Sequence, residues 1–174
     1  MRYNLKDVAL STLKSALLLV ILEVIGSAFF PAIGLTNFRP AFSVLIVLYV
    51  AFKINTPLLP FVILVIQNVH SIFSIEGWAI STLIGVLVAI AVKYFKDLLD
   101  FSTAVSTIVV VQISQIIWFV LLALFLSIKL SDFSNFLTIF WQFIPESIAL
   151  SLVSPWFFSL LDKMWVSKSQ NSRI

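Results

Sequence analysis

The polar side chains that fall inside long apolar stretches are the residues of this sequence best placed to do chemistry. Glu23 lies within the apolar run 13–31, with Gly26 and Ser27 three and four residues further along. An unpaired charge inside a membrane costs about 3 kcal/mol or more, so this carboxyl group needs a partner, a proton or water. The residue could bind a proton or grip a substrate, or it could form a hydrogen bond to a neighbouring helix.

A second polar group lies in the run 58–75. Its members recur at i, i+3, i+4 and i+7 and are Gln67, His70, Ser71 and Ser74, with Asn68 beside them. On a helix this spacing puts them on one face, which must contact protein or a water-filled cavity rather than lipid. The stripe is typical of a small-solute site with His70 as a titratable member, or of hydrogen bonding between helices.

Two further positions are polar within the apolar sequence. Gln112 and Gln115 form an i, i+3 pair in the run 104–128, and the same two interpretations apply to them. Glu146 follows Pro145, and a proline with an acid just after it is a helix-start signature. We therefore predict a new helix at Pro145, with Glu146 near the membrane surface; a single long helix would instead bury Glu146 in the membrane.

The sequence gives no sign of catalysis, metal binding or a cofactor. It contains no Cys and one His, which leaves no thiolate chemistry and no pair of histidines to bind a metal. The dinucleotide, phosphate-loop, zinc-protease and serine-hydrolase motifs are all absent. Glu23, His70 and Glu146 could converge in an intramembrane enzyme, but nothing in their spacing requires it. We predict a protein that is not an enzyme.

The composition indicates that these residues sit in membrane helices. Of the 174 residues, 61% are hydrophobic and 11% are charged, and the mean hydropathy is +1.12. A soluble domain has about 25% charged residues. Each crossing needs about 20 residues, so six crossings leave roughly 54 of the 174. This remainder is too small for a soluble catalytic lobe, a nucleotide-binding domain or a DNA-binding module, and we expect no nucleic-acid partner.

The apolar runs predict an all-α, polytopic membrane protein that is a single transmembrane domain over residues 1–174. The predicted spans are 13–31, 41–52, 58–75, 79–92, 104–128 and 145–163, with an interfacial helix at 134–144. The first run also resembles a signal peptide, but Glu23 within it favours a retained helix.

The basic residues predict the orientation of these spans. With six spans, the loops on the side of the N-terminus carry nine Lys and Arg, which are Arg2, Lys6, Lys14, Lys53, Lys93, Lys96, Lys163, Lys168 and Arg173. The opposite loops carry two, Arg39 and Lys129. Loops rich in Lys and Arg face the cytoplasm, so both termini are predicted to be cytoplasmic.

Two segments resemble the MreD family of rod shape-determining membrane proteins. They are 37–50 (NFRPAFSVLIVLYV) and 154–163 (SPWFFSLLDK), and the order of spans is also similar. Two positions depart from the family pattern. Gln67 and Asn68 stand where many relatives have an acidic residue near a Gly, and Leu150 and Ser151 stand where an Asn is often found.

The resemblance implies a non-enzymatic scaffold of cell elongation and peptidoglycan synthesis in the bacterial inner membrane. The partners it implies are an MreC-like periplasmic coiled-coil protein, an MreB-like actin filament, and the elongation synthase RodA with its transpeptidase. The family is similar in fold to the substrate-binding components of energy-coupling-factor transporters. The alternative function is therefore binding of a small solute or vitamin for uptake.

Overall fold

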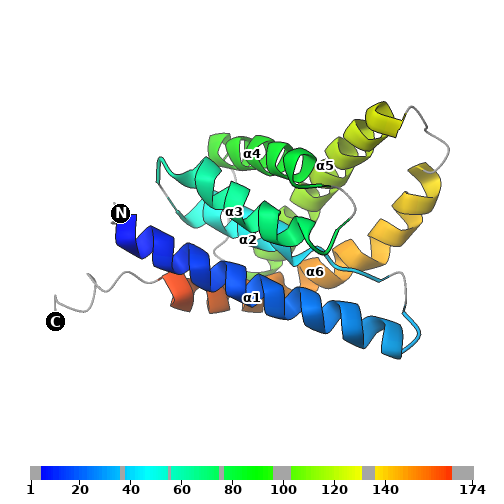
Figure 1. Cartoon of the computed structure of the whole chain (residues 1–174), viewed down its shortest axis with the longest axis horizontal. Helices are drawn as coiled ribbons and strands as arrows, with labels where there is room; N and C mark the ends of the chain where they lie inside the picture. Colours follow the sequence, from blue (N-terminus) through cyan, green and yellow to red (C-terminus); the bar gives the residue numbers. More distant parts are fainter. Residues whose placement is uncertain are drawn as a thin grey trace.

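The computed structural model describes residues 5–35, 38–54, 56–74, 77–95, 103–130 and 136–165, and within them every regular element is a helix (Figure 1). The six helices are α1 (Leu5–Ala32), α2 (Phe42–Lys53), α3 (Leu59–Ser71), α4 (Trp78–Tyr94), α5 (Ala104–Leu130) and α6 (Phe136–Trp165). The predicted all-α class is confirmed. Each predicted span overlaps one of these helices, while the number of membrane crossings stays a prediction.

Helix length separates the six into two groups. Helix α1 and the parts of α5 and α6 that cover Ala104–Lys129 and Phe143–Trp165 are long and apolar enough to cross a membrane. The short helices α2, α3 and α4 have 12, 13 and 17 residues. At 1.5 Å per residue they are about 18, 20 and 26 Å long, against about 30 Å of bilayer hydrocarbon. The chain therefore has the features of a helical membrane protein, with three long and three short helices.

Helix α2 is the centre of the molecule. Every residue from Ser43 to Ala51 is buried, and α2 contacts each of the other five helices. A helix that is apolar on all faces is stable where other helices surround it. The sequence FSVLIVLYVAFK meets this condition, since its only charged residue is Lys53 at the C-terminal end.

The short helices follow one another closely in the sequence. Residues 54–58, which include Pro57, connect α2 to α3, and residues 72–77 connect α3 to α4. Gly77 has a φ of +82°, a conformation that glycine adopts at little cost. Because successive helices are antiparallel, the start of α2, the end of α3 and the start of α4 lie at the same end. We call this the Trp78 end of the short helices.

Gly85 allows α4 to approach its neighbours closely. A Cβ added to Gly85 would lie 2.8 Å from Ile63 Cγ2 on α3 and 3.3 Å from Trp118 Cη2 on α5. A distance of 2.8 Å is too short for two carbon atoms, so no other residue fits here without movement. Small residues commonly set the spacing of helices in membranes, and Gly85 has this role between α3, α4 and α5.

Helix α1 is packed along its first half and exposed along its second. Its buried residues all lie between Val8 and Leu19, and no residue from Ile21 to Leu35 is buried. The packed half is tied to the end of α6, where Trp165 Nε1 donates a hydrogen bond to Ser15 Oγ at 2.9 Å. In Figure 1 the second half of α1 extends beyond the ribbons of α2 and α3.

The prediction of a new helix at Pro145 was wrong. Helix α6 is a single helix of 30 residues, with Pro145 and Pro155 inside it. A proline inside a helix removes one backbone hydrogen bond and commonly bends the helix rather than ending it. Helix α6 is indeed curved in Figure 1. Within the described residues, the segment predicted as an interfacial helix at 134–144 forms the first turns of α6.

Candidate functional site

Glu23 and His70 form a partly buried polar pair between α1 and α3. The Nδ1 atom of His70 lies 2.7 Å from Oε1 of Glu23, and the two side chains are 9% and 14% exposed. Of the two interpretations of Glu23, the structure places the carboxyl group against a neighbouring helix. The pair also brings together two residues that the sequence singled out separately.

The two side chains are matched as hydrogen-bond donor and acceptor. Either the imidazole Nδ1–H donates to the carboxylate Oε1, or a protonated carboxyl group donates to Nδ1. Either form keeps a hydrogen bond between Nδ1 and Oε1. Such a pair is far cheaper to bury than an isolated charge, which explains how Glu23 is accommodated within an apolar helix.

The rest of the predicted stripe on α3 does not share one environment. Gln67 is fully buried and His70 is 7% exposed, whereas Asn68 is exposed. Ser71 Oγ donates to the carbonyl oxygen of Asn68 at 2.7 Å, which satisfies the hydroxyl within α3 itself. The inward face of the stripe is therefore Gln67 and His70, and Asn68 lies outside it.

Several buried polar atoms at the Trp78 end have no hydrogen-bond partner within the described residues. They are both amide atoms of Gln67 and the hydroxyls of Ser43, Ser74 and Thr82. Ser43 begins α2, Gln67 and Ser74 flank the end of α3, and Thr82 is in the first turns of α4. A buried polar group without a partner costs about 1–3 kcal/mol, so these are the atoms at this end that water or a ligand could satisfy.

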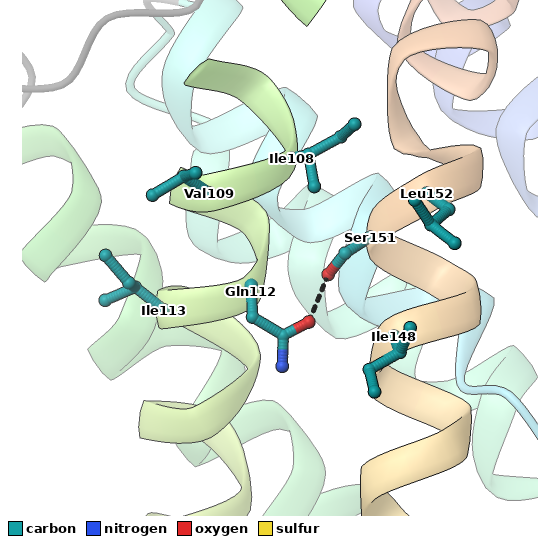
Figure 2. A pocket seen from close by; sticks show the side chains of 7 residues that line it. All are labelled: Ile108, Val109, Gln112, Ile113, Ile148, Ser151 and Leu152. Atoms are coloured by element: carbon teal, nitrogen blue, oxygen red, sulfur yellow. Dashed lines mark hydrogen bonds between the residues drawn. The ribbon is translucent and has the colours of Figure 1, made fainter. Parts of the chain in front are cut away.

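Gln112 and Gln115 join α5 to α6 through a ladder of hydrogen bonds. Gln112 Nε2 donates to Ser147 Oγ at 3.1 Å, and Gln112 Oε1 accepts from Ser151 Oγ at 2.7 Å (Figure 2). Gln115 Nε2 donates to Ser151 Oγ at 2.9 Å. Both glutamines therefore bond across helices, as one of the two sequence interpretations expected.

An open groove of about 240 Å³ runs beside this ladder. Its lining is mostly aliphatic and consists of Ile108, Val109, Gln112, Ile113, Ile148, Ser151 and Leu152 (Figure 2). The polar atoms of Gln112 already bond to α6, so the groove offers hydrocarbon walls rather than free donors and acceptors. The second polar position of the sequence thus serves helix packing at the edge of an apolar groove.

Glu146 is placed differently from the prediction. It lies ten residues inside α6, half-buried, and its Oε1 accepts a hydrogen bond from the backbone N–H of Arg39 at 2.8 Å. The carboxylate therefore links α6 to the segment that leads into α2, and it is not an acid in the first turn of a helix. Of the three residues considered for an intramembrane enzyme, the described contacts join Glu23 with His70 and place Glu146 against Arg39.

The sequence analysis missed the partners on α6. Ser147, Ser151 and Ser154 recur at i, i+4 and i+7 and are all buried, and two of them bond to the glutamines of α5. Their helical spacing was visible within the predicted span 145–163, but the spacing alone does not say which neighbouring helix the serines face. Asp162 was also missed, because its partner Tyr49 lies 113 residues away.

Within the described ranges, no three His, Asp or Glu side chains come together as metal ligands. No protein-family model, curated protein or solved structure matches the chain.

Proposed function

We propose that this protein is a non-enzymatic membrane scaffold of the bacterial cell-elongation machinery, similar to MreD. The observation that carries the proposal is the contact between the two segments that resemble that family. Tyr49 from the first segment donates a hydrogen bond to Asp162 Oδ1 of the second at 3.0 Å. The ring of Tyr49 packs edge-on against Phe158, with centroids 5.6 Å apart, and Phe42 contacts Phe157.

This contact supports the proposal because it connects distant parts of the sequence at the centre of the fold. The segment 37–50 contains most of α2, the helix that touches all the others, and 154–163 contains the part of α6 packed on it. A family that shares both segments would share this central packing. The short connections between the described helices also favour a protein that binds its partners through helices rather than through a soluble domain.

In the proposed topology all six helices cross the bacterial inner membrane and both termini are cytoplasmic. The uneven distribution of Lys and Arg supports this orientation. The short helices α2, α3 and α4 would cross with the help of flanking residues or a locally thinner bilayer. The proposed partners are the membrane lipids, an MreC-like coiled-coil protein, an MreB-like filament, and RodA with its transpeptidase, with no cofactor and no nucleic acid.

Depletion of the protein from a rod-shaped bacterium that carries it tests this function. We expect depleted cells to become round while solute uptake stays normal, and a plasmid copy should restore the rod shape. An empty plasmid is the control and should leave the depleted cells round. Cells that remain rods after complete loss of the protein would exclude the proposed role.

Binding of a small solute for uptake is the second candidate, and the unpartnered polar atoms at the Trp78 end favour it. Gln67 has a free donor and acceptor pair in a fully buried position, which a polar ligand could satisfy after a local opening. Thermal unfolding of the purified protein with a panel of vitamins tests this function. A ligand that raises the melting temperature of the wild type but not of Gln67→Leu would support it, and no shift with any ligand would count heavily against it.

A further inference from the structure

The open groove between α5 and α6 lies at the surface of two helices that are long and apolar enough to cross a membrane (Figure 2). Its rims are aliphatic side chains, each about half exposed, and are Val109 and Ile113 on α5 and Ile148 and Leu152 on α6. The two polar side chains that line it, Gln112 and Ser151, bond to each other. An occupant of the groove therefore meets hydrocarbon and needs no donor or acceptor of its own.

The face of α6 that forms one rim becomes polar toward the end of the helix. Trp156 and Lys163 follow Leu152 by four and eleven residues, which places both within about 40° of Leu152 around the helix axis. Trp156 is 73% exposed, and Lys163 is exposed about 16 Å beyond Leu152 along the axis. Within the described ranges, neither the indole N–H nor the ammonium group has a hydrogen-bond or ion-pair partner. One face of α6 thus carries an aliphatic rim, then an indole donor, then a cation.

This polar part of α6 lies at the end of the bundle where α5 begins. Phe119 of α5 stacks on Phe143 of α6. Gln112, which is nearer the start of α5, bonds to Ser151, which is further along α6. The two helices are therefore antiparallel, and Trp156 is level with the first turns of α5. Because tryptophan and lysine anchor membrane helices at the membrane surface, the groove leads from hydrocarbon to that surface.

We propose that the groove between α5 and α6 binds a membrane phospholipid, with one acyl chain between the rims and the phosphate at Lys163. The indole N–H of Trp156 donates to the ester oxygens of the lipid, and the ammonium group of Lys163 pairs with its phosphate. The site goes beyond the scaffold function. It requires only that α5 and α6 lie in a membrane, whichever partners the protein binds.

The groove fits a flexible chain better than it fits a helix of a partner or of a second copy. Its volume is about 240 Å³. A helix with its side chains is about 10 Å across, so even 10 Å of its length fills roughly 800 Å³. Contacts between membrane helices also favour small residues that let the backbones approach, whereas the rims here are Val, Ile and Leu. A helix would rest on the rims, and an acyl chain can enter between them.

Photocrosslinking in vesicles tests the proposal. The full chain is placed in vesicles of phosphatidylethanolamine and phosphatidylglycerol that contain a little phosphatidylglycerol with a diazirine on its acyl chain. Mass spectrometry then maps the lipid adducts. We expect adducts on the rims at Val109, Ile113 and Leu152 to exceed those at Ile90 several-fold, because Ile90 is a 59% exposed residue of α4 outside the groove.

Two variants separate the acyl-chain contact from the phosphate contact. Ile148→Trp fills the groove and should lower the rim adducts several-fold, while the matched control Ile90→Trp should leave them unchanged. Lys163→Gln should lower them about fivefold, the effect expected of one lysine near an anionic surface. A photoreactive diacylglycerol with the same chains has no phosphate, so it should label the wild type and Lys163→Gln equally.

The map of the wild type decides the outcome even if a variant fails to fold. Adducts spread evenly over the exposed residues of α4, α5 and α6 would show only the surrounding bilayer and would overturn the proposal. The chain has no Cys, so Ile113→Cys reports the contacts of the groove without background. A disulfide-linked dimer of Ile113→Cys in the same vesicles would place a second copy on the groove, and the lipid site would be rejected.

Discussion

Tyr49 of α2 donates a hydrogen bond to Asp162 of α6 across 3.0 Å, and the same carboxylate lies 3.7 Å from the ammonium group of Lys53. Asp162 therefore connects both ends of one helical turn of α2 to α6, since Tyr49 and Lys53 are four residues apart. The tyrosine is buried and the carboxylate is about half exposed. The contact joins the most buried helix to the end of the described chain.

Removal of this hydrogen bond should weaken the α2–α6 contact. For Tyr49→Phe we expect a loss of about 1 kcal/mol in the free energy of unfolding, because the bond is to a charged group that is partly screened by solvent. Thermal or denaturant unfolding in detergent measures it. Lys53→Ala is the control and should change stability less, since exposed ion pairs contribute little. Equal losses for both variants would contradict the importance of the hydrogen bond.

The ladder between α5 and α6 should show coupled energetics. Ser151 accepts from Gln115 and donates to Gln112, so Ser151→Ala should destabilise the protein by about 1 kcal/mol. A double-mutant cycle with Gln112→Leu should give a coupling energy of about 0.6 kcal/mol, as found for hydrogen bonds between membrane helices. Additive effects of the two substitutions would show that the described bond contributes nothing to stability.

Substitution of Gly85 should separate α3, α4 and α5. For Gly85→Ala we expect destabilisation by about 1–3 kcal/mol, because the new methyl group would overlap Ile63 on α3. Gly26→Ala is the matched control, since a Cβ there meets nothing closer than 3.6 Å, in the ring of Phe30. The melting temperature of each variant provides the comparison. A Gly85→Ala protein as stable as the wild type would contradict the close approach.

Replacement of Gln67 by an apolar residue should stabilise the protein if the amide is present for function rather than for folding. Gln67→Met keeps the volume and removes two unpartnered polar atoms, so we expect a gain of about 1–3 kcal/mol. Asn68→Met, at the exposed neighbouring position, should change stability little. A loss of stability in Gln67→Met, measured in the same unfolding assay, would mean that the amide has a partner which it needs for folding.

The sequence predicted the all-α class and the apolar helices because composition and apolar runs depend on local residues. Runs of apolar residues indicated six helical regions, and the polar interruptions identified Glu23, His70, Gln112 and Gln115 as helix-facing positions. Partner choice could not be predicted in the same way. Glu23 and His70 are 47 residues apart, and which helices become neighbours is decided by tertiary packing.

The error at Pro145 has a physical cause of the same kind. A proline at a first helical position and a proline inside a bent helix have similar local sequences, and the difference lies in what covers the helix. On the C-terminal side of Pro145, Ser147 of α6 accepts a hydrogen bond from Gln112 of α5. On the N-terminal side, Phe143 of α6 stacks on Phe119 of α5, with ring centroids 4.5 Å apart. Contacts of α5 on both sides of the proline favour one continuous helix.

Copurification of the protein in mild detergent, followed by identification of the bound proteins, tests the scaffold function most directly. The account predicts recovery of a periplasmic coiled-coil protein of the MreC kind in a fixed ratio to this chain. Recovery of an ATPase module in its place would contradict the account and favour solute uptake.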